Sequence, residues 1–230
     1  MDSPSLDELG ERLGIALRDP EAIRQAFVHS SYFNENQQLV TGHNERLEFL
    51  GDAVIGLVVS RLLYDRFSDE DEGLLTARRA ALVNRDALAR LALRSGMDRY
   101  LLLGRGEAEA GGGSRPSLLA ALFEAVAGAI YLVEGLPATR RWLLHLFSEE
   151  LDGPDRAALK SAKSRLQEWS QRIHRQKPRY EVLDTAGPPH DQRFRVAVML
   201  NGRRIAEGTG SSRQRAEEAA AGLAMERVHR

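Results

Sequence analysis

The chain has 230 residues, enough for one large domain or two modest ones, and its 43% hydrophobic and 28% charged content is typical of a globular protein. It contains no cysteine, which excludes disulfides, thiolate catalysis and cysteine-ligated zinc. The net charge of −1 hides an asymmetry, because residues 161–230 carry 14 Lys+Arg and 8 Asp+Glu (net +6) while the rest of the chain carries 18 and 25 (net −7), and such a basic module is a candidate for binding a polyanion.

The N-terminus shows no targeting segment. The stretch from Met1 to Gly10 is polar and acidic, and it has neither the basic start nor the apolar run of a signal peptide. No apolar run elsewhere in the sequence approaches the length of a membrane span. We therefore expect a cytoplasmic protein with no membrane partner.

Apolar residues recur at helical spacing throughout residues 1–151. Helices are predicted over residues 5–17, 19–32, 44–67, 74–94, 118–133 and 137–151. The stretch 104–115 is too rich in glycine for regular structure, and we expect it to be a mobile loop. It is not a phosphate-binding loop, because no Gly-Lys-Ser/Thr follows and no strand precedes it. Residues 1–151 are therefore predicted to form an all-α domain.

The helix that begins near Asn44, a favourable N-cap residue, carries an unusual set of acids. Glu45, Glu48 and Asp52 fall at i, i+3 and i+7, so they share one face and repel one another. A hard divalent cation with oxygen ligands would compensate this repulsion, whereas the alternative is a solvated acidic face. Glu72, near the start of the next helix, is a fourth candidate, although an acid there also suits the helix dipole.

The most apolar predicted helix contains a single acid before its end, Glu124. A carboxylate in such surroundings is costly unless it is neutralised. We expect Glu124 to face Glu48 and Asp52 across a shared metal; a buried ion pair with an arginine is the alternative. Gly128 and the neighbouring alanines would allow the two helices to approach closely.

The pattern changes after a plausible linker at residues 152–160. A helix is predicted over 161–173, followed by strands over 180–183, 194–200 and 203–208 and a final helix over 212–228. Asn201-Gly202 is a strong two-residue hairpin turn. Residues 161–230 are therefore predicted to form an α+β domain of order α-β-β-β-α.

Several motifs carry a resemblance to a known family. Residues 44–52, Asn-Glu-Arg-Leu-Glu-Phe-Leu-Gly-Asp, resemble the signature of the ribonuclease III family of double-stranded-RNA endonucleases, with support from motifs at 26–32, 82–84, 117–120 and 123–125. The second module resembles a double-stranded-RNA-binding domain in residues 164–168, 187–190 and 208–217. The resemblance covers nearly the whole chain and implies a multidomain protein, a catalytic domain followed by a binding domain.

The resemblance implies hydrolysis of phosphodiester bonds with Mg2+, for which Mn2+ may substitute, and the processing of ribosomal RNA precursors and structured messenger RNAs. The roles that it implies are metal binding for Glu48, Asp52 and Glu124, catalysis for Asp52 and Glu124, and a secondary place in the acidic cleft for Glu45 and Glu72. It also implies a homodimer with Phe49 at the interface, whereas the alternative for Phe49 is ordinary core.

In the second module the resemblance places Gln167, Glu168 and His190 at successive minor grooves of the RNA. Arg213, Gln214 and Arg215 open the final helix, where positive side chains and free backbone N–H groups can meet phosphates. The alternatives are a solvated surface for the arginines and a simple turn residue for His190.

One residue departs from the family pattern. The family has an aspartate three residues before the helix glutamate, and this position is Ala121. Loss of a metal ligand predicts weaker Mg2+ binding and slower cleavage, so a non-cleaving double-stranded-RNA-binding protein is an alternative function, and a structural helical dimer is a third. Ala121 is either a natural variant or an engineered change, and the intact neighbouring motif favours the second.

Overall fold

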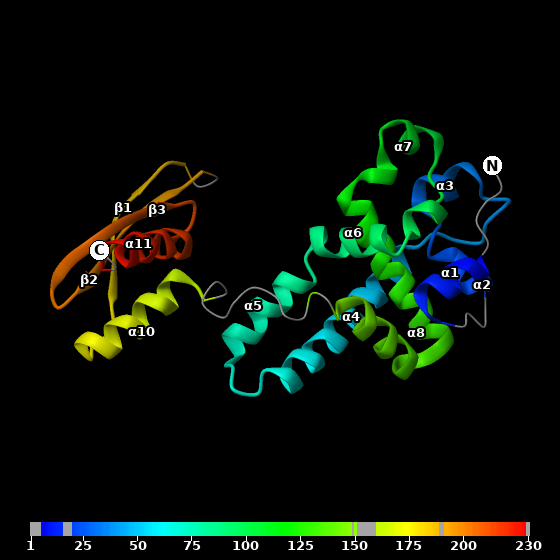
Figure 1. Cartoon of the computed structure of the whole chain (residues 1–230). Helices are drawn as coiled ribbons and strands as arrows, with labels where there is room; N and C mark the ends of the chain where they lie inside the picture. The colour runs from blue at the N-terminus through cyan, green and yellow to red at the C-terminus, as the bar shows by residue number, and fades with distance from the viewer. Residues whose placement is uncertain (1–5, 16–19, 149, 151–159, 189–190, 229–230) are drawn as a thin grey trace. The chain divides into compact units, whose positions relative to one another are not determined.

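The structure, a computed structural model, describes residues 6–15, 20–148, 150, 160–188 and 191–228. The chain divides into two compact units, Met1–Gly153 and Pro154–Arg230. The first unit is built from helices, and the second combines helices with a three-stranded sheet (Figure 1). This arrangement confirms the predicted fold class.

The first unit consists of eight helices and two short 3-10 turns within its described residues. The helices are α1 (Leu6–Leu13), α2 (Pro20–Gln25), α3 (Ser30–Glu35), α4 (Glu45–Arg66), α5 (Glu72–Leu82), α6 (Arg85–Arg94), α7 (Arg105–Glu109) and α8 (Pro116–Phe147). The 3-10 turns are η1 (Met97–Tyr100) and η2 (Gly112–Ser114). The described part of this unit contains no strand, only an isolated bridge between Val28 and Leu102.

Helix α8 is the centre of the first unit's core. Its two predicted segments are joined across a kink at Gly135, whose φ of 76° is left-handed. By length and composition α8 could cross a membrane, but 56% of its most apolar window is buried inside the protein, as in a central core helix. No run of this length is expected from the sequence because the apolar helix is predicted only over residues 118–133, whereas α8 begins at Pro116 and continues beyond residue 133.

Two glycines allow α4 and α8 to cross in close contact. A Cβ on Gly51 would lie 1.7 Å from the carbonyl oxygen of Glu124, and a Cβ on Gly128 would lie 2.2 Å from the carbonyl oxygen of Leu47. No larger residue fits at either position without moving a helix backbone. The predicted close approach at Gly128 is confirmed, and the crossing brings the acidic face of α4 beside Glu124.

Two helices that the sequence predicts as continuous are broken by capping side chains. Asn84 ends the predicted 74–94 helix, because its side-chain oxygen accepts a hydrogen bond from the Ala87 N–H and starts α6. His29 likewise separates α2 from α3 by accepting from the Ser31 N–H. Asn44 is the N-cap residue of α4 as predicted, but its side-chain amide donates to the carbonyl of Ala26 at 3.1 Å and makes no capping hydrogen bond to the helix.

The glycine-rich stretch 104–115 forms regular secondary structure, whereas the sequence predicts a mobile loop. It forms α7 and η2, and tertiary bonds hold its start, since the Gly104 N–H donates to Ser31 Oγ at 2.9 Å and the Arg105 N–H donates to Glu35 at 3.0 Å. An ion pair of 2.9 Å links Arg115 to Glu107. Hydrogen bonds to Ser31 and Glu35, which are distant in sequence, thus stabilise a stretch whose glycines have low intrinsic helix propensity.

The second unit follows the predicted order closely. It comprises α10 (Ala162–His174), β1 (Arg179–Ala186), β2 (Arg193–Leu200), β3 (Arg203–Gly210) and α11 (Arg213–Val228), and the sheet is antiparallel with the order β1-β2-β3. Asn201 and Gly202, with φ of 51° and 74°, form the predicted hairpin turn. Helix α11 packs on β2 and β3, and α10 packs on α11, through a core of mostly small residues, chiefly alanines. Residues 152–159 of the predicted linker lie outside the described residues.

Candidate functional site

The α4–α8 crossing brings three of the predicted acids together. Glu48 and Asp52 lie one turn apart on α4, and Glu124 lies on α8 beside them. Glu48 and Glu124 are half-buried, whereas Asp52 is exposed. The structure thus brings Glu124 close enough to Glu48 and Asp52 for their charges to act on it, although more than seventy residues separate them in sequence.

The carboxylates of this cluster influence one another strongly. Burial, followed by the charges of Asp52 and Glu48, raises the pKa of Glu124 to about 7. Burial, followed by Glu45 and Asp52, also raises the pKa of Glu48. None of the described residues forms a hydrogen bond or ion pair with the side chains of Glu48, Asp52 or Glu124. The expected alternative, a buried arginine partner for Glu124, is therefore absent from the described structure.

The donor set suits a hard divalent cation, because it consists of carboxylate oxygens with no cation beside them. The described residues contain no group of three or more His, Cys, Asp or Glu that already converges as a metal site. Asp52 is thus close enough to raise the pKa of both Glu48 and Glu124, although the three side chains are not drawn onto one point. In their chemistry they fit the expected metal.

Ala121 lies one turn before Glu124 on α8 and is half-buried. Residues at i and i+3 of a helix share a face, so an aspartate at this position would point to the same side as Glu124. The methyl group of Ala121 supplies no oxygen. The cluster therefore has three carboxylates, without the fourth that the resemblance implies at position 121.

The two secondary acids behave differently. Glu45 is exposed, lies 3.8 Å from a ring nitrogen of His43, and contributes to the raised pKa of Glu48. Glu72 is exposed at the start of α5, where it accepts a hydrogen bond from Thr76 at 3.2 Å. The structure therefore brings Glu45 to the cluster and shows no link between Glu72 and the three central carboxylates.

Helix α4 carries a second apolar face that the core does not cover. Phe49 is 81% exposed, Leu57 58% and Tyr64 69%. Their spacing of eight and seven residues keeps them on one stripe of the helix, separate from the buried residues. The alternative that Phe49 is a core residue is therefore wrong.

The predicted RNA-binding residues are exposed where the structure describes them. Gln167 and Glu168 lie on α10, with Glu168 paired to Lys160. Arg213, Gln214 and Arg215 form the first turn of α11. His190 lies outside the described residues.

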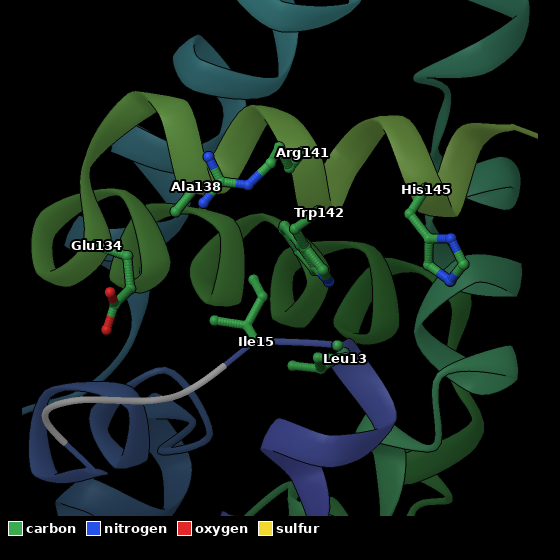
Figure 2. Close-up of a pocket in the computed structure, with 8 residues that line it drawn as sticks. Leu13, Ile15, Glu134, Ala138, Arg141, Trp142 and His145 are labelled. Carbon is green, nitrogen blue, oxygen red and sulfur yellow. The ribbon is translucent and has the colours of Figure 1, made fainter.

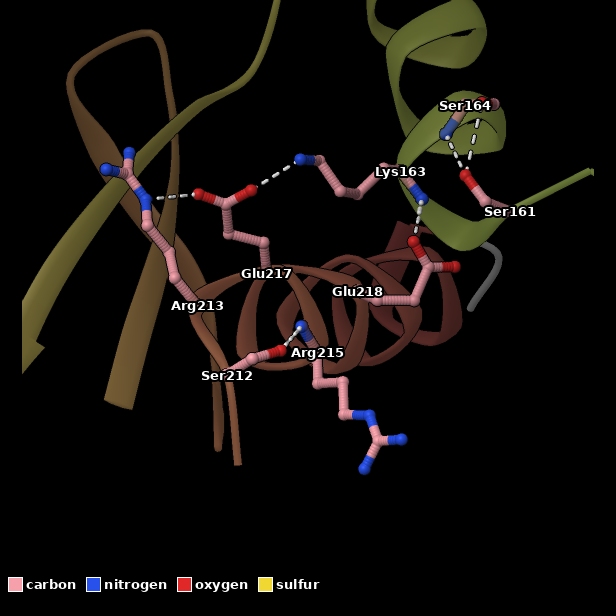
Figure 3. Close-up of polar contacts among 8 residues, drawn as sticks. All are labelled: Ser161, Lys163, Ser164, Ser212, Arg213, Arg215, Glu217 and Glu218. Carbon is pink, nitrogen blue, oxygen red and sulfur yellow. Dashed lines mark hydrogen bonds and ion pairs between the residues drawn. The ribbon is translucent and has the colours of Figure 1, made fainter. Parts of the chain in front are cut away.

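Glu217 links the two helices of the second unit (Figure 3). It accepts hydrogen bonds from Arg213 at 2.8 Å and from Lys163 at 2.5 Å. Burial alone would raise the pKa of Glu217, but the hydrogen bonds from these two cations lower it. The next residue, Glu218, accepts from the backbone N–H groups of Ala162 and Lys163 and so caps α10 from outside.

Lys163 and Glu217 are absent from the candidate residues that the sequence suggests. The Arg213–Glu217 pair could have been found from its i,i+4 spacing. The link from Glu217 to Lys163 spans 54 residues and has no local signal. Their contact fixes the start of α10 beside the start of α11, the two segments predicted to meet RNA.

The first unit also contains a pocket of about 450 Å³ between the end of α1 and the second half of α8 (Figure 2). Leu13 and Ile15 face Trp142 across it, and Arg141 and His145 stand at its rim. The indole stacks on Phe123 with ring centroids 5.5 Å apart, and its N–H has no hydrogen-bond partner among the described residues. No residue of the carboxylate cluster lines this pocket.

Comparison with known proteins matches both units of the chain. Residues 19–151 match the model of the ribonuclease-III-like family, and residues 162–228 match the double-stranded RNA binding motif. The chain is 45% identical over 218 residues to Ribonuclease 3 of Heliobacterium modesticaldum, covering 95% of this chain and 93% of that protein. It is 42% identical over 228 residues to Ribonuclease 3 of Enterococcus faecalis, covering 99% of both.

Among solved structures, the nuclease domain of ribonuclease III from Campylobacter jejuni superposes with a TM-score of 0.59 at 33% identity, covering 64% of this chain and 99% of that one. That structure is described for flexibility in the region involved in its dimer formation. Family models thus match both units of the chain, and the solved structure matches the helical one. The chain belongs to the ribonuclease III family of endoribonucleases.

Proposed function

We propose that the protein hydrolyses double-stranded RNA with Mg2+ bound by Glu48, Asp52 and Glu124. The observation that carries this proposal is the uncompensated cluster at the α4–α8 crossing, where burial and two neighbouring acids raise the pKa of Glu124 to about 7. Such a strongly perturbed carboxyl group is typical of a functional site. A solvated acidic face would not raise the pKa of Glu124 in this way.

Each side chain of the cluster has a distinct part in this chemistry. When bound, Mg2+ supplies an activated water and stabilises the negative charge that develops on the phosphate oxygens. Asp52, the exposed member, offers its oxygens on the solvent side of the crossing. Glu124 holds a proton up to about pH 7 in the absence of a cation, so it must release this proton before it can act as a ligand or base.

The second unit is proposed to deliver the duplex. Arg213 and Arg215 stand at the start of α11, where positive side chains and unpaired backbone N–H groups favour phosphate. Glu217 holds Arg213 and Lys163 on adjacent helices, so these two cations are already placed for the charged backbone. Proteins read duplex RNA by its shape and backbone, which suits Gln167 and Glu168 on the exposed face of α10.

We propose that Ala121 slows cleavage. With three carboxylates in place of four, the site binds Mg2+ less tightly. We further propose that the enzyme acts in the cytoplasm on precursors of ribosomal RNA and structured messenger RNAs, as the family implies. A non-cleaving double-stranded-RNA-binding protein is the second candidate function, and Ala121 is the observation that favours it.

The test compares this protein with an Ala121→Asp variant on a long RNA duplex, with and without Mg2+. We expect Mg2+-dependent cleavage by both and a faster rate for the variant, by about 10-fold or more if a metal ligand is restored. Equal rates would refute the role assigned to position 121. Binding without cleavage by both proteins would instead support the second function.

A separate measurement tests the metal itself. Millimolar Mg2+ is expected to raise the thermal midpoint of the protein, because a ligand that binds only the folded state stabilises it. The Asp52→Asn variant should show a smaller rise. A structural helical dimer that uses its acids only as surface would show no Mg2+-dependent shift.

A further inference from the structure

The second unit contains a basic hollow that none of the predicted RNA-binding residues lines. It has a volume of about 940 Å³ and lies where α10 ends, β1 begins and the β2–β3 turn closes. Its polar lining includes His174, Gln176, Lys177, Arg179, Glu181 and Asn201. We call it the β1-start hollow.

The sheet register places this hollow at one end of the unit. Arg179, the first residue of β1, pairs with Met199 near the end of β2, so the β2–β3 turn lies at the same end. Ala186 pairs with Arg193, and Phe194 pairs with Gly210, so the β1–β2 turn and the start of α11 lie at the opposite end. Strands of eight residues separate the two ends by roughly 25 Å.

The cations of the hollow are not neutralised within the unit. Lys177 and Arg179 are exposed and form no ion pair with any other described residue. Several other basic residues of this unit are paired with an acid, for example Arg204 with Glu207 at 2.6 Å and Arg213 with Glu217 at 2.8 Å. The β1-start hollow thus keeps unpaired positive charge at a site that is hollowed and lined by amide groups.

We propose that the β1-start hollow is a second binding site for the phosphate backbone of RNA. Lys177 and Arg179 supply the positive charge, while the side-chain amides of Gln176 and Asn201 can hydrogen-bond phosphate and 2′-hydroxyl oxygens. The backbone comes either from the same duplex, extended past α10, or from a second duplex. This inference rests on the proposed RNA binding by the second unit and adds a site to it.

The test uses the full chain without divalent ions and measures RNA affinity between about 50 and 200 mM salt. A duplex of about 16 base pairs, the span of one such domain, is compared with one twice that length. The Lys177→Gln/Arg179→Gln variant is expected to lower the salt slope of log K on the bound RNA by up to about 2, roughly one unit per lost phosphate contact. The Glu181→Gln variant is the matched control in the same hollow and should tighten binding.

Two measurements distinguish the possible sources of the RNA backbone, the same duplex and a second duplex. If the same duplex extends into the hollow, the double variant weakens only the longer duplex. If a second duplex binds there, the double variant lowers the number of short duplexes bound per chain from two to one, a count that dimer formation does not change. An unchanged salt slope together with an unchanged number of duplexes per chain would overturn the proposal.

An Arg213→Gln/Arg215→Gln variant distinguishes a wrong second site from a wrong proposal that the second unit binds RNA. Loss of all binding in this variant, with no effect of the Lys177→Gln/Arg179→Gln change, would leave the proposed function intact and remove only the second site. No binding of any duplex by the unaltered protein would refute RNA binding by the unit itself.

Discussion

At the scale of single residues, Glu124 shows how environment decides chemistry. The same carboxyl group on an exposed helix would ionise near its ordinary value of 4.5, but here burial and two acids hold the proton to about pH 7. An aspartate in place of Ala121, one turn away, would add a further negative charge to this environment. The balance between proton and cation at Glu124 is therefore sensitive to single substitutions.

The raised pKa of Glu124 predicts a pH-dependent stability in the absence of divalent ions. Between pH 4.5 and about 7 the folded protein keeps a proton that the unfolded chain has lost, so the free energy of unfolding falls as the pH rises through this window. The Glu124→Gln variant has no carboxyl group to ionise at this position, so its free energy of unfolding does not fall in this way. It should be more stable than the unaltered protein at pH 8, by about 1 kcal/mol after allowance for solvent screening of a half-exposed group.

Urea unfolding at pH 5 and pH 8 measures this effect. The stability difference between the Glu124→Gln variant and the unaltered protein should grow from pH 5 to pH 8. An equal difference at both values would show that Glu124 titrates as an ordinary surface acid.

At the scale of elements, the α4–α8 crossing positions the site. Helix propensity alone would disfavour Gly51 and Gly128 inside helices, by up to about 1 kcal/mol each. Their lack of a Cβ is what permits backbone contact, since Gly51 faces the carbonyl of Glu124 and Gly128 faces that of Leu47. The glycines and the acids are therefore parts of one arrangement.

A Gly51→Ala substitution should separate the two helices. The added Cβ would lie 1.7 Å from the carbonyl oxygen of Glu124, so we expect a loss of about 3 kcal/mol or more of unfolding free energy. Gly56→Ala on the same helix is the matched control, because its Cβ meets no atom within 4 Å, and it should stabilise by about 0.5–1 kcal/mol. Chemical denaturation of both variants is the measurement, and equal effects would contradict the packing argument.

At the scale of the whole molecule, the exposed apolar stripe on α4 favours a homodimer. Phe49, Leu57 and Tyr64 lie next to the acidic face, and large exposed apolar side chains in one patch indicate an interaction surface. The nuclease domain from Campylobacter jejuni is described through its own dimer-forming region. A two-fold dimer would bring two carboxylate clusters to one assembly.

The Phe49→Arg variant should weaken dimerisation. Burying a charge in place of an aromatic side chain is expected to raise the dimer dissociation constant by about 10-fold or more. Leu93→Arg, a similarly exposed apolar position on α6, should leave it unchanged. Sedimentation equilibrium over a range of concentrations distinguishes them. A monomeric unaltered protein at micromolar concentration, or equal effects of both changes, would contradict the assignment of the stripe.

The sequence by itself predicts the α and α+β halves, because apolar periodicity, the Asn201-Gly202 turn and charge asymmetry are local signals. It also selects Glu48, Asp52 and Glu124 as partners. Acids that share a helix face, and a single acid in an apolar helix, both need a positive charge to offset their own. It misplaces the breaks at His29 and Asn84 and the form of residues 104–115, where single side-chain caps and distant hydrogen bonds outweigh local propensity.

Only the tertiary structure decides how the three carboxylates meet. The backbone contacts of Gly51 and Gly128 bring α4 and α8 together, and burial at that crossing raises the pKa of Glu124. Tertiary structure likewise exposes Phe49 and joins Lys163 to Glu217 across 54 residues. Long-range packing and desolvation depend on which segments meet in space, whereas helices, strands and turns depend largely on neighbours in sequence.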